Sequence, residues 1–168
     1  GYVYAQDGEF EKSDEVFGRY LNVRKNFSAH HEWMGLILNN LNSQFAAYYG
    51  LGLSQMQRNN IDQAIEYFNK VVESVNDFEF THHLLARCYR QKKDYPKILV
   101  HCDKAIEYGH EDAEIYIIKG EAFLNLGEST KASECFDKAR QLDKSNFASH
   151  LGLASAASLD GKYDEALK

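Results

Sequence analysis

The sequence predicts an all-α fold, an α-solenoid built from antiparallel helix pairs. The main observation is a pattern that returns every 34 residues without gaps, in units that start at Phe45, Glu79, Ala113 and Phe147. A second observation is that apolar and small residues recur within each unit at the spacing of helix faces. A third is that 168 residues include a single proline, so long irregular loops are not expected. A residue's place denotes its number within its 34-residue unit.

The first half of each unit predicts one helix. Places 4, 7, 8 and 11 follow the i, i+3, i+4, i+7 spacing of a single helix face. Place 8 is always small, which allows two helix backbones to approach each other. Place 4 is occupied by Tyr48, His82, Tyr116 and His150, and place 8 by Gly52, Ala86, Gly120 and Ala154.

The second half of each unit predicts a second helix, whose inner face carries places 20, 24 and 27. An aromatic residue at place 24 is expected to fill the space beside the small residues. Place 20 is occupied by Ala64, Ile98, Ala132 and Ala166, place 24 by Phe68, Cys102 and Phe136, and place 27 by Val71, Ala105 and Ala139.

Short turns are expected between the helices. Place 15, where a left-handed residue would end the first helix, is occupied by Gly127, Gly161, Asn59 and Lys93. The last two are less favourable there than glycine. Asp94 can cap the following helix, with Pro96 in its first turn. The candidate caps for the first helix of each unit are Asp77, Asp112 and Ser145.

This 34-residue pattern resembles the tetratricopeptide repeat. Unit 113–146 is the closest match, although Lys119 stands where leucine is usual. Unit 79–112 departs further, with His82 and Cys102 at aromatic places, and the proline that the family has near the end of each unit is absent. The resemblance implies a right-handed superhelix whose concave groove holds a peptide or helix of a partner protein.

One solenoid domain is expected over residues 1–168. It consists of a partial repeat at 1–27, an extra helix segment at 28–44 with its helix near 28–41, repeats at 45–78, 79–112 and 113–146, and a partial repeat at 147–168. The first partial repeat is assigned from Tyr4, Gly8, Phe10, Ser13, Phe17 and Tyr20. Both ends fall within a unit, so we expect a longer parent protein. An alternative makes 28–61 a repeat of its own, with Gly35, Leu38, Ala47 and Leu51 at the key places.

Composition disfavours several classes of protein. The net charge is −6, which argues against a nucleic-acid binder, since such proteins need a basic face. No apolar run is long enough for a membrane span. The three cysteines have no CxxC spacing, so neither disulfides nor a zinc–cysteine site is expected, and a reducing, cytoplasmic location is the simpler interpretation.

The candidate binding face lies about 130° around each first helix from its core face, at places 2, 5, 9 and 12. The resemblance implies that this face lines the groove. Its residues are Tyr49, Leu53, Met56, Phe80, His83, Arg87, Arg90, Glu114, Ile117 and Glu121. Arg87 and Arg90 could hold an acidic group of a partner. They could equally pair with Glu114 and Glu121 of the next unit, and both alternatives remain open.

No catalytic residues, cofactor or metal site are expected. His82–His83 and His30–His31 are neighbours, whose side chains point about 100° apart on a helix and do not readily share one ion. A packed histidine is the simpler interpretation of His82 and His150, and a buried thiol that of each cysteine.

We therefore expect a protein–protein interaction module or scaffold and not an enzyme. A structural, self-assembling homo-oligomer and a non-catalytic appendage of a larger enzyme are the alternatives. A chaperone C-terminal tail is not the expected partner. The two-carboxylate clamp that binds such tails in this family requires Lys and Asn at places occupied here by Tyr49, Leu53 and Leu84, and Lys and Arg at places occupied by Glu114 and Ile118.

Overall fold

The computed structural model describes residues 11–12, 14–19, 34–74 and 79–161, and within these ranges every regular element is a helix. The predicted all-α fold is confirmed. The chain divides into two compact units, residues 1–77 and 78–168. The division falls within one residue of the predicted boundary between repeats 45–78 and 79–112.

The first unit is built on helices α3 (Met34–Gln57) and α4 (Ile61–Ser74), which pack together. A helical stretch at residues 14–19 adds Phe17 to a core that it shares with Ala47 and Leu51. The Phe17 ring lies so close to Gly50 that a Cβ there would be 2.1 Å from a ring carbon. Phe17 is therefore part of the core of this unit. The other residues that assign the first partial repeat lie outside the described ranges.

Helix α3 changes the interpretation of segment 28–44. The helix expected there is present from Met34, but it runs without a break into the first helix of repeat 45–78. Residues 42–44, Asn-Ser-Gln, include neither glycine nor proline, so nothing ends the helix at this point. The alternative repeat at 28–61 is wrong, because it would need a turn near Asn42, which lies inside α3. Residues 28–33 are not among those described.

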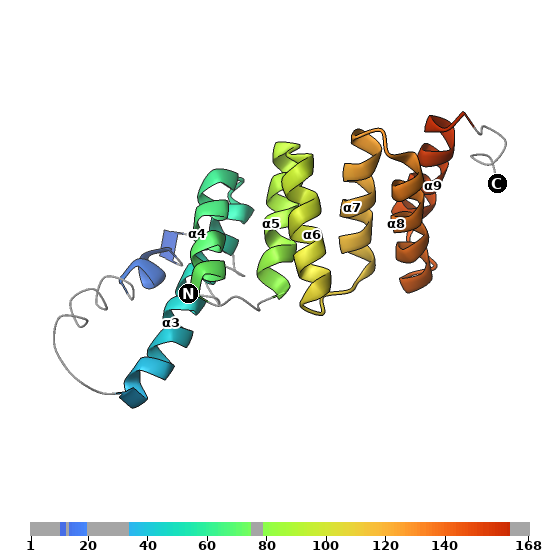
Figure 1. Cartoon of the computed structure of the whole chain (residues 1–168). Helices are drawn as coiled ribbons and strands as arrows, with labels where there is room; N and C mark the ends of the chain where they lie inside the picture. The colour runs from blue at the N-terminus through green and yellow to red at the C-terminus, as the bar shows by residue number, and fades with distance from the viewer. Residues whose placement is uncertain (1–10, 13, 20–33, 75–78, 162–168) are drawn as a thin grey trace. The chain divides into compact units, whose positions relative to one another are not determined.

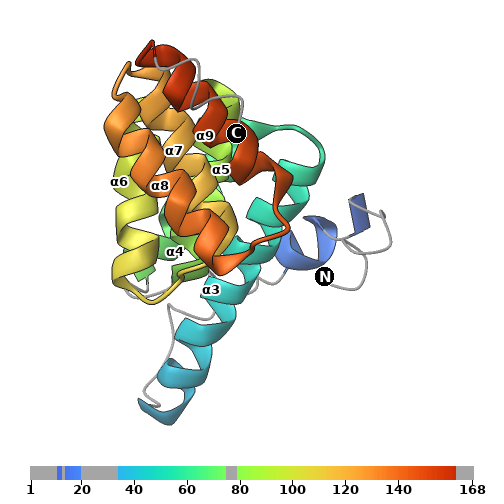
Figure 2. The ribbon, with the colours of Figure 1, turned by 90° about the vertical axis from the view of Figure 1, so that its right-hand side faces the viewer.

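The second unit stacks helices in chain order: α5 (Glu79–Lys92), α6 (Tyr95–Glu107), α7 (Ala113–Asn125), α8 (Ser129–Leu142) and α9 (Phe147–Leu159). Each packs on the next, and α7 also contacts both α5 and α9 (Figures 1 and 2). The first helices of successive pairs thus share one layer. Pairs α5–α6 and α7–α8 fall within the predicted repeats, which confirms the solenoid architecture.

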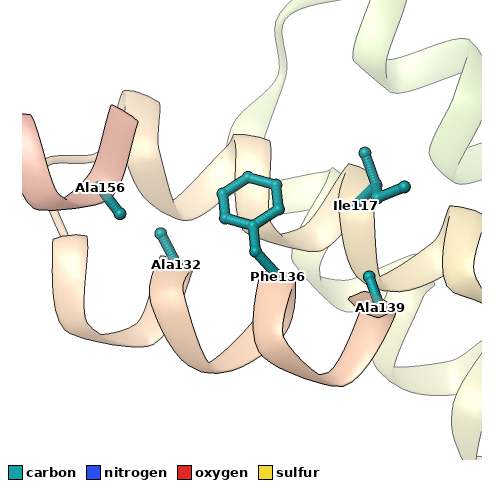
Figure 3. Packing of buried hydrophobic residues seen from close by; sticks show 5 residues of the cluster. All are labelled: Ile117, Ala132, Phe136, Ala139 and Ala156. Atoms are coloured by element: carbon teal, nitrogen blue, oxygen red, sulfur yellow. The ribbon is translucent and has the colours of Figure 1, made fainter. Parts of the chain in front are cut away.

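The core between α7, α8 and α9 is centred on Phe136, whose neighbours are mostly alanines (Figure 3). A Cβ on Gly120 would lie 2.9 Å from this ring, and one on Gly152 would lie 2.4 Å from it. Small residues on α7 and α9 therefore make room for the aromatic of α8, as predicted for places 8 and 24. Gly152, at place 6, was not anticipated.

The turns follow the predicted caps with one correction. All four residues at place 15 have positive φ, including Asn59 at 62° and Lys93 at 56°. Asp112 caps α7 by accepting a hydrogen bond from the backbone N–H of Ile115 at 2.8 Å. The predicted cap Ser145 is wrong, because Asn146, one residue later, accepts from two backbone N–H groups of α9. Asp77 lies outside the described ranges.

Candidate functional site

The predicted binding residues are divided between the two units. Tyr49, Leu53 and Met56 are half-buried on α3, in the first unit. The Tyr49 ring lies 6.1 Å from both the Phe45 and the Phe68 ring, and burial raises the pKa of its hydroxyl. The other seven residues lie on α5 and α7 of the second unit. The α5–α7 face denotes these seven: Phe80, His83, Arg87, Arg90, Glu114, Ile117 and Glu121.

Both arginines of this face pair with glutamates of the neighbouring helix. Arg90 binds Glu121 through two contacts, from Nε to Oε2 at 2.6 Å and from a terminal nitrogen to Oε1 at 2.7 Å. Arg87 Nε lies 3.4 Å from Glu114 Oε1. The internal ion pairs that the sequence left open are therefore present. All four side chains remain partly exposed, between 34% and 47%.

The apolar members of the face differ in accessibility. Phe80 is 46% exposed, and its ring packs edge-on against His110 at 5.1 Å. Ile117 is only 6% exposed and belongs to the core around Phe136. It therefore offers a partner almost no surface, because the stacking of α7 on its neighbours covers it.

The α5–α7 face includes part of a histidine cluster, which consists of His83 on α5 and of His110 and Asp112 in the turn before α7. His83 is buried, and its ring stacks on that of His110 with 4.5 Å between centroids. His83 Nε2 lies 3.4 Å from Glu114 Oε2, and His110 Nε2 lies 3.2 Å from Asp112 Oδ2. Neither nitrogen makes a hydrogen bond of proper geometry. Burial lowers the pKa of His83, and the nearby Glu114 carboxylate opposes that shift.

The repeat pattern did not predict that His110 and Asp112 lie beside His83. Both lie in the turn between α6 and α7, outside the helical places that the repeat pattern samples. The available signal was a pair of metal-binding residue types two apart in a short turn. Adjacent histidines do not readily share an ion, but His83 meets a histidine far along the chain.

A second histidine pair lies inside the α5–α6 pair. His82 Nδ1 is 3.0 Å from His101 Nδ1, so one nitrogen donates to the other. Burial, helped by the charge of Lys104, lowers the pKa of each imidazole to about 4. His82 is the packed histidine that the sequence predicts. His150 is instead exposed, because place 4 of α9 is not covered in the way it is in α5 and α7.

The three cysteines are buried free thiols, as expected. Burial raises the pKa of Cys88 to about 11 and raises that of Cys102 further. Such thiols are poor nucleophiles, because the reactive thiolate is scarcely populated near neutral pH.

Stacked helix pairs whose first helices share one layer define an α-helical repeat protein. Two tetratricopeptide repeat models match residues 46–75 and 103–168, together more than half of the chain. The chain belongs to the tetratricopeptide repeat family.

Two curated relatives have comparable identity. A TPR repeat-containing protein of Methanocaldococcus jannaschii is 25% identical over 158 residues, which is 92% of this chain and 27% of that protein. The BBSome complex member BBS4 of Bos taurus is 25% identical over 119 residues, which is 71% of this chain and 23% of its own length. This chain thus spans about a quarter of the length of these relatives.

Solved structures share the fold at lower identity. The crystal structure of MamA has a TM-score of 0.82 and 18% identity, with 98% of this chain and 81% of MamA covered. The first TPR of Spaghetti, bound to an HSP90 peptide, has a TM-score of 0.66 and 16% identity, with 70% of this chain and 93% of that chain covered.

None of the described helices is long and apolar enough to cross a membrane.

Proposed function

We propose that this chain is a protein-interaction scaffold that binds an acidic segment of a partner protein on the α5–α7 face. The observation that carries the proposal is the pair of half-exposed arginines, Arg87 and Arg90, on the same helix as the exposed ring of Phe80. Arginine and aromatic side chains are the residue types that most often anchor protein interfaces. A peptide in complex with a tetratricopeptide repeat of the same fold supports this kind of function.

The internal ion pairs do not block such binding. Ion pairs between partly exposed side chains contribute only about 0–1 kcal/mol, because water and salt screen them. A carboxylate of the partner can therefore displace Glu114 or Glu121 at little cost. The released glutamates remain at the surface, where they are solvated. The face would then select partners by charge, with Phe80 adding apolar contact.

The acidic segment is not expected to be a chaperone C-terminal tail. The places of the two-carboxylate clamp carry Glu114 and Ile118 in α7 and Leu84 in α5. Ile118 and Leu84 are buried aliphatic side chains, so they have no basic or amide group to offer. The proposed site therefore differs from the clamp in its chemistry.

The test is a selection of peptides from a random display library on the purified chain. We expect selected peptides rich in Asp and Glu. We expect the double variant Arg87→Gln/Arg90→Gln to bind them about tenfold more weakly or worse, the equivalent of about 1.4 kcal/mol. Fluorescence anisotropy of the labelled peptides measures the loss.

The matched control is Arg140→Gln, which removes an arginine on α8 that pairs locally with Asp137. It should bind as the wild type does. A selection without acidic preference, or equal binding by the double variant with unchanged helicity in circular dichroism, would show that this face is not the site.

A further inference from the structure

We propose that His83, His110 and Asp112 form a binding site for one divalent transition-metal ion, with zinc as the best match. Among the described residues, these three bring their ligand atoms within 4.8 Å of one another. They come from α5 and from the turn before α7, so the ion would tie the first helix of repeat 79–112 to the turn that leads into the next repeat. The metal site shares His83 with the α5–α7 face, but it does not require that this face binds an acidic segment.

Each of the two histidines has a ring nitrogen near a carboxylate that makes no hydrogen bond. His83 Nε2 and His110 Nε2 are buried, on side chains that are 10% and 12% exposed, and neither is hydrogen-bonded. Buried polar atoms are nearly always satisfied, because an unsatisfied one loses its hydration without compensation. A metal ion would satisfy both nitrogens at once. The stacked rings already hold these nitrogens on neighbouring side chains.

Asp112 is held ready to bind by its capping role. Its Oδ1 accepts the hydrogen bond from the Ile115 N–H at 2.8 Å, which fixes the carboxylate. Its Oδ2 faces His110 Nε2 at 3.2 Å and remains available as a ligand. Hydrogen bonds that orient a ligand in this way are typical of metal sites.

The distances require only a small closure. Zinc–nitrogen and zinc–oxygen bonds of about 2.0–2.2 Å at tetrahedral angles place ligand atoms about 3.3–3.5 Å apart. The ligand atoms must therefore approach one another by up to about 1.5 Å, with the two stacked imidazoles turned so that both nitrogens point at the ion. Glu114 Oε2 lies 3.4 Å from His83 Nε2 and can take the fourth position, which otherwise falls to water.

The ligand set indicates the class of ion. Two imidazoles and a carboxylate suit zinc and other late first-row divalent ions, whereas magnesium and calcium prefer oxygen ligands alone. The His82–His101 pair offers a contrast, because its two facing nitrogens already bond to each other at 3.0 Å. That pair is therefore a natural control.

The experiment titrates zinc into chelator-treated protein by calorimetry and cobalt by visible absorption. We expect one ion per chain, with cobalt bands of a tetrahedral nitrogen–oxygen site and no thiolate charge-transfer band. His110→Gln and Asp112→Asn should each weaken binding at least about tenfold, the range found even when a residue behind the ligands is lost. Asp112→Asn keeps a good helix cap, so it separates loss of the ligand from loss of the fold.

Three controls make the result decisive. His101→Gln, the exposed His150→Gln, and the double variant His30→Gln/His31→Gln should all bind as the wild type does. Circular dichroism checks that each variant remains helical. The proposal is overturned if the wild type binds no ion, if one ion bridges two chains, or if Asp112→Asn binds as tightly as the wild type.

Discussion

At the scale of single residues, histidines are the side chains whose environments matter most. His82 and His101 are held neutral by burial, with pKa values lowered to about 4. His83 is shifted in the same direction by the same cause. An unfolded histidine titrates near 6.5. Between these values the unfolded chain binds more protons than the folded one, so acid favours unfolding.

We therefore predict that the free energy of unfolding is nearly constant between about pH 7 and 8 and falls as the pH drops from about 6.5 toward 4. Each such histidine contributes at most about 1.4 kcal/mol per pH unit in that window. Urea denaturation at pH 7 and pH 5 measures the effect. The drop should shrink in His101→Gln and persist in His150→Gln. Equal stability at both pH values would contradict the assignment of neutral, buried imidazoles.

At the scale of helices, the repeat depends on close approach between a small residue and a ring. Phe136 of α8 lies against Gly120 of α7 and Gly152 of α9. Phe68 of α4 lies against Gly52 of α3 in the same manner, where a Cβ would be 2.5 Å from the ring. This close contact between a glycine at place 8 and an aromatic ring at place 24 thus occurs in both units.

Gly120→Val should therefore destabilise the protein by about 1–3 kcal/mol or more, because the added atoms overlap the Phe136 ring. Chemical denaturation provides the measurement. Gly18→Val is the matched control, since a Cβ at Gly18 meets nothing within 4 Å. Similar effects of the two substitutions would be inconsistent with the packing described for α7 and α8.

At the scale of the whole molecule, the fold was predictable and the candidate site only partly so. The 34-residue period identified the helix pairs, because core contacts recur at fixed places. The sequence did not predict that residues 34–44 continue into the first helix of repeat 45–78, because the 34-residue period does not extend into them. The histidine cluster was missed for a different reason: His83 meets a residue in the turn at the end of its own repeat, and such contacts depend on how the helices pack rather than on local spacing.

The two compact units lead to a prediction about fragments. Residues 78–168 contain their own core around Phe136, and helical repeats draw their stability from immediate neighbours. We expect this fragment to be helical in circular dichroism and to unfold cooperatively on heating. Phe136→Ala in the same fragment should cost about 3–5 kcal/mol. A fragment without a cooperative transition would show that the unit depends on residues 1–77.

The two carboxylate oxygens of Asp112 have different partners. Oδ1 accepts a hydrogen bond at the start of α7, and Oδ2 faces His110. A ligand bound to Oδ2 would therefore act directly on the turn between α6 and α7, where one repeat ends and the next begins. Ion binding and the N-terminal cap of α7 would thus depend on the same side chain.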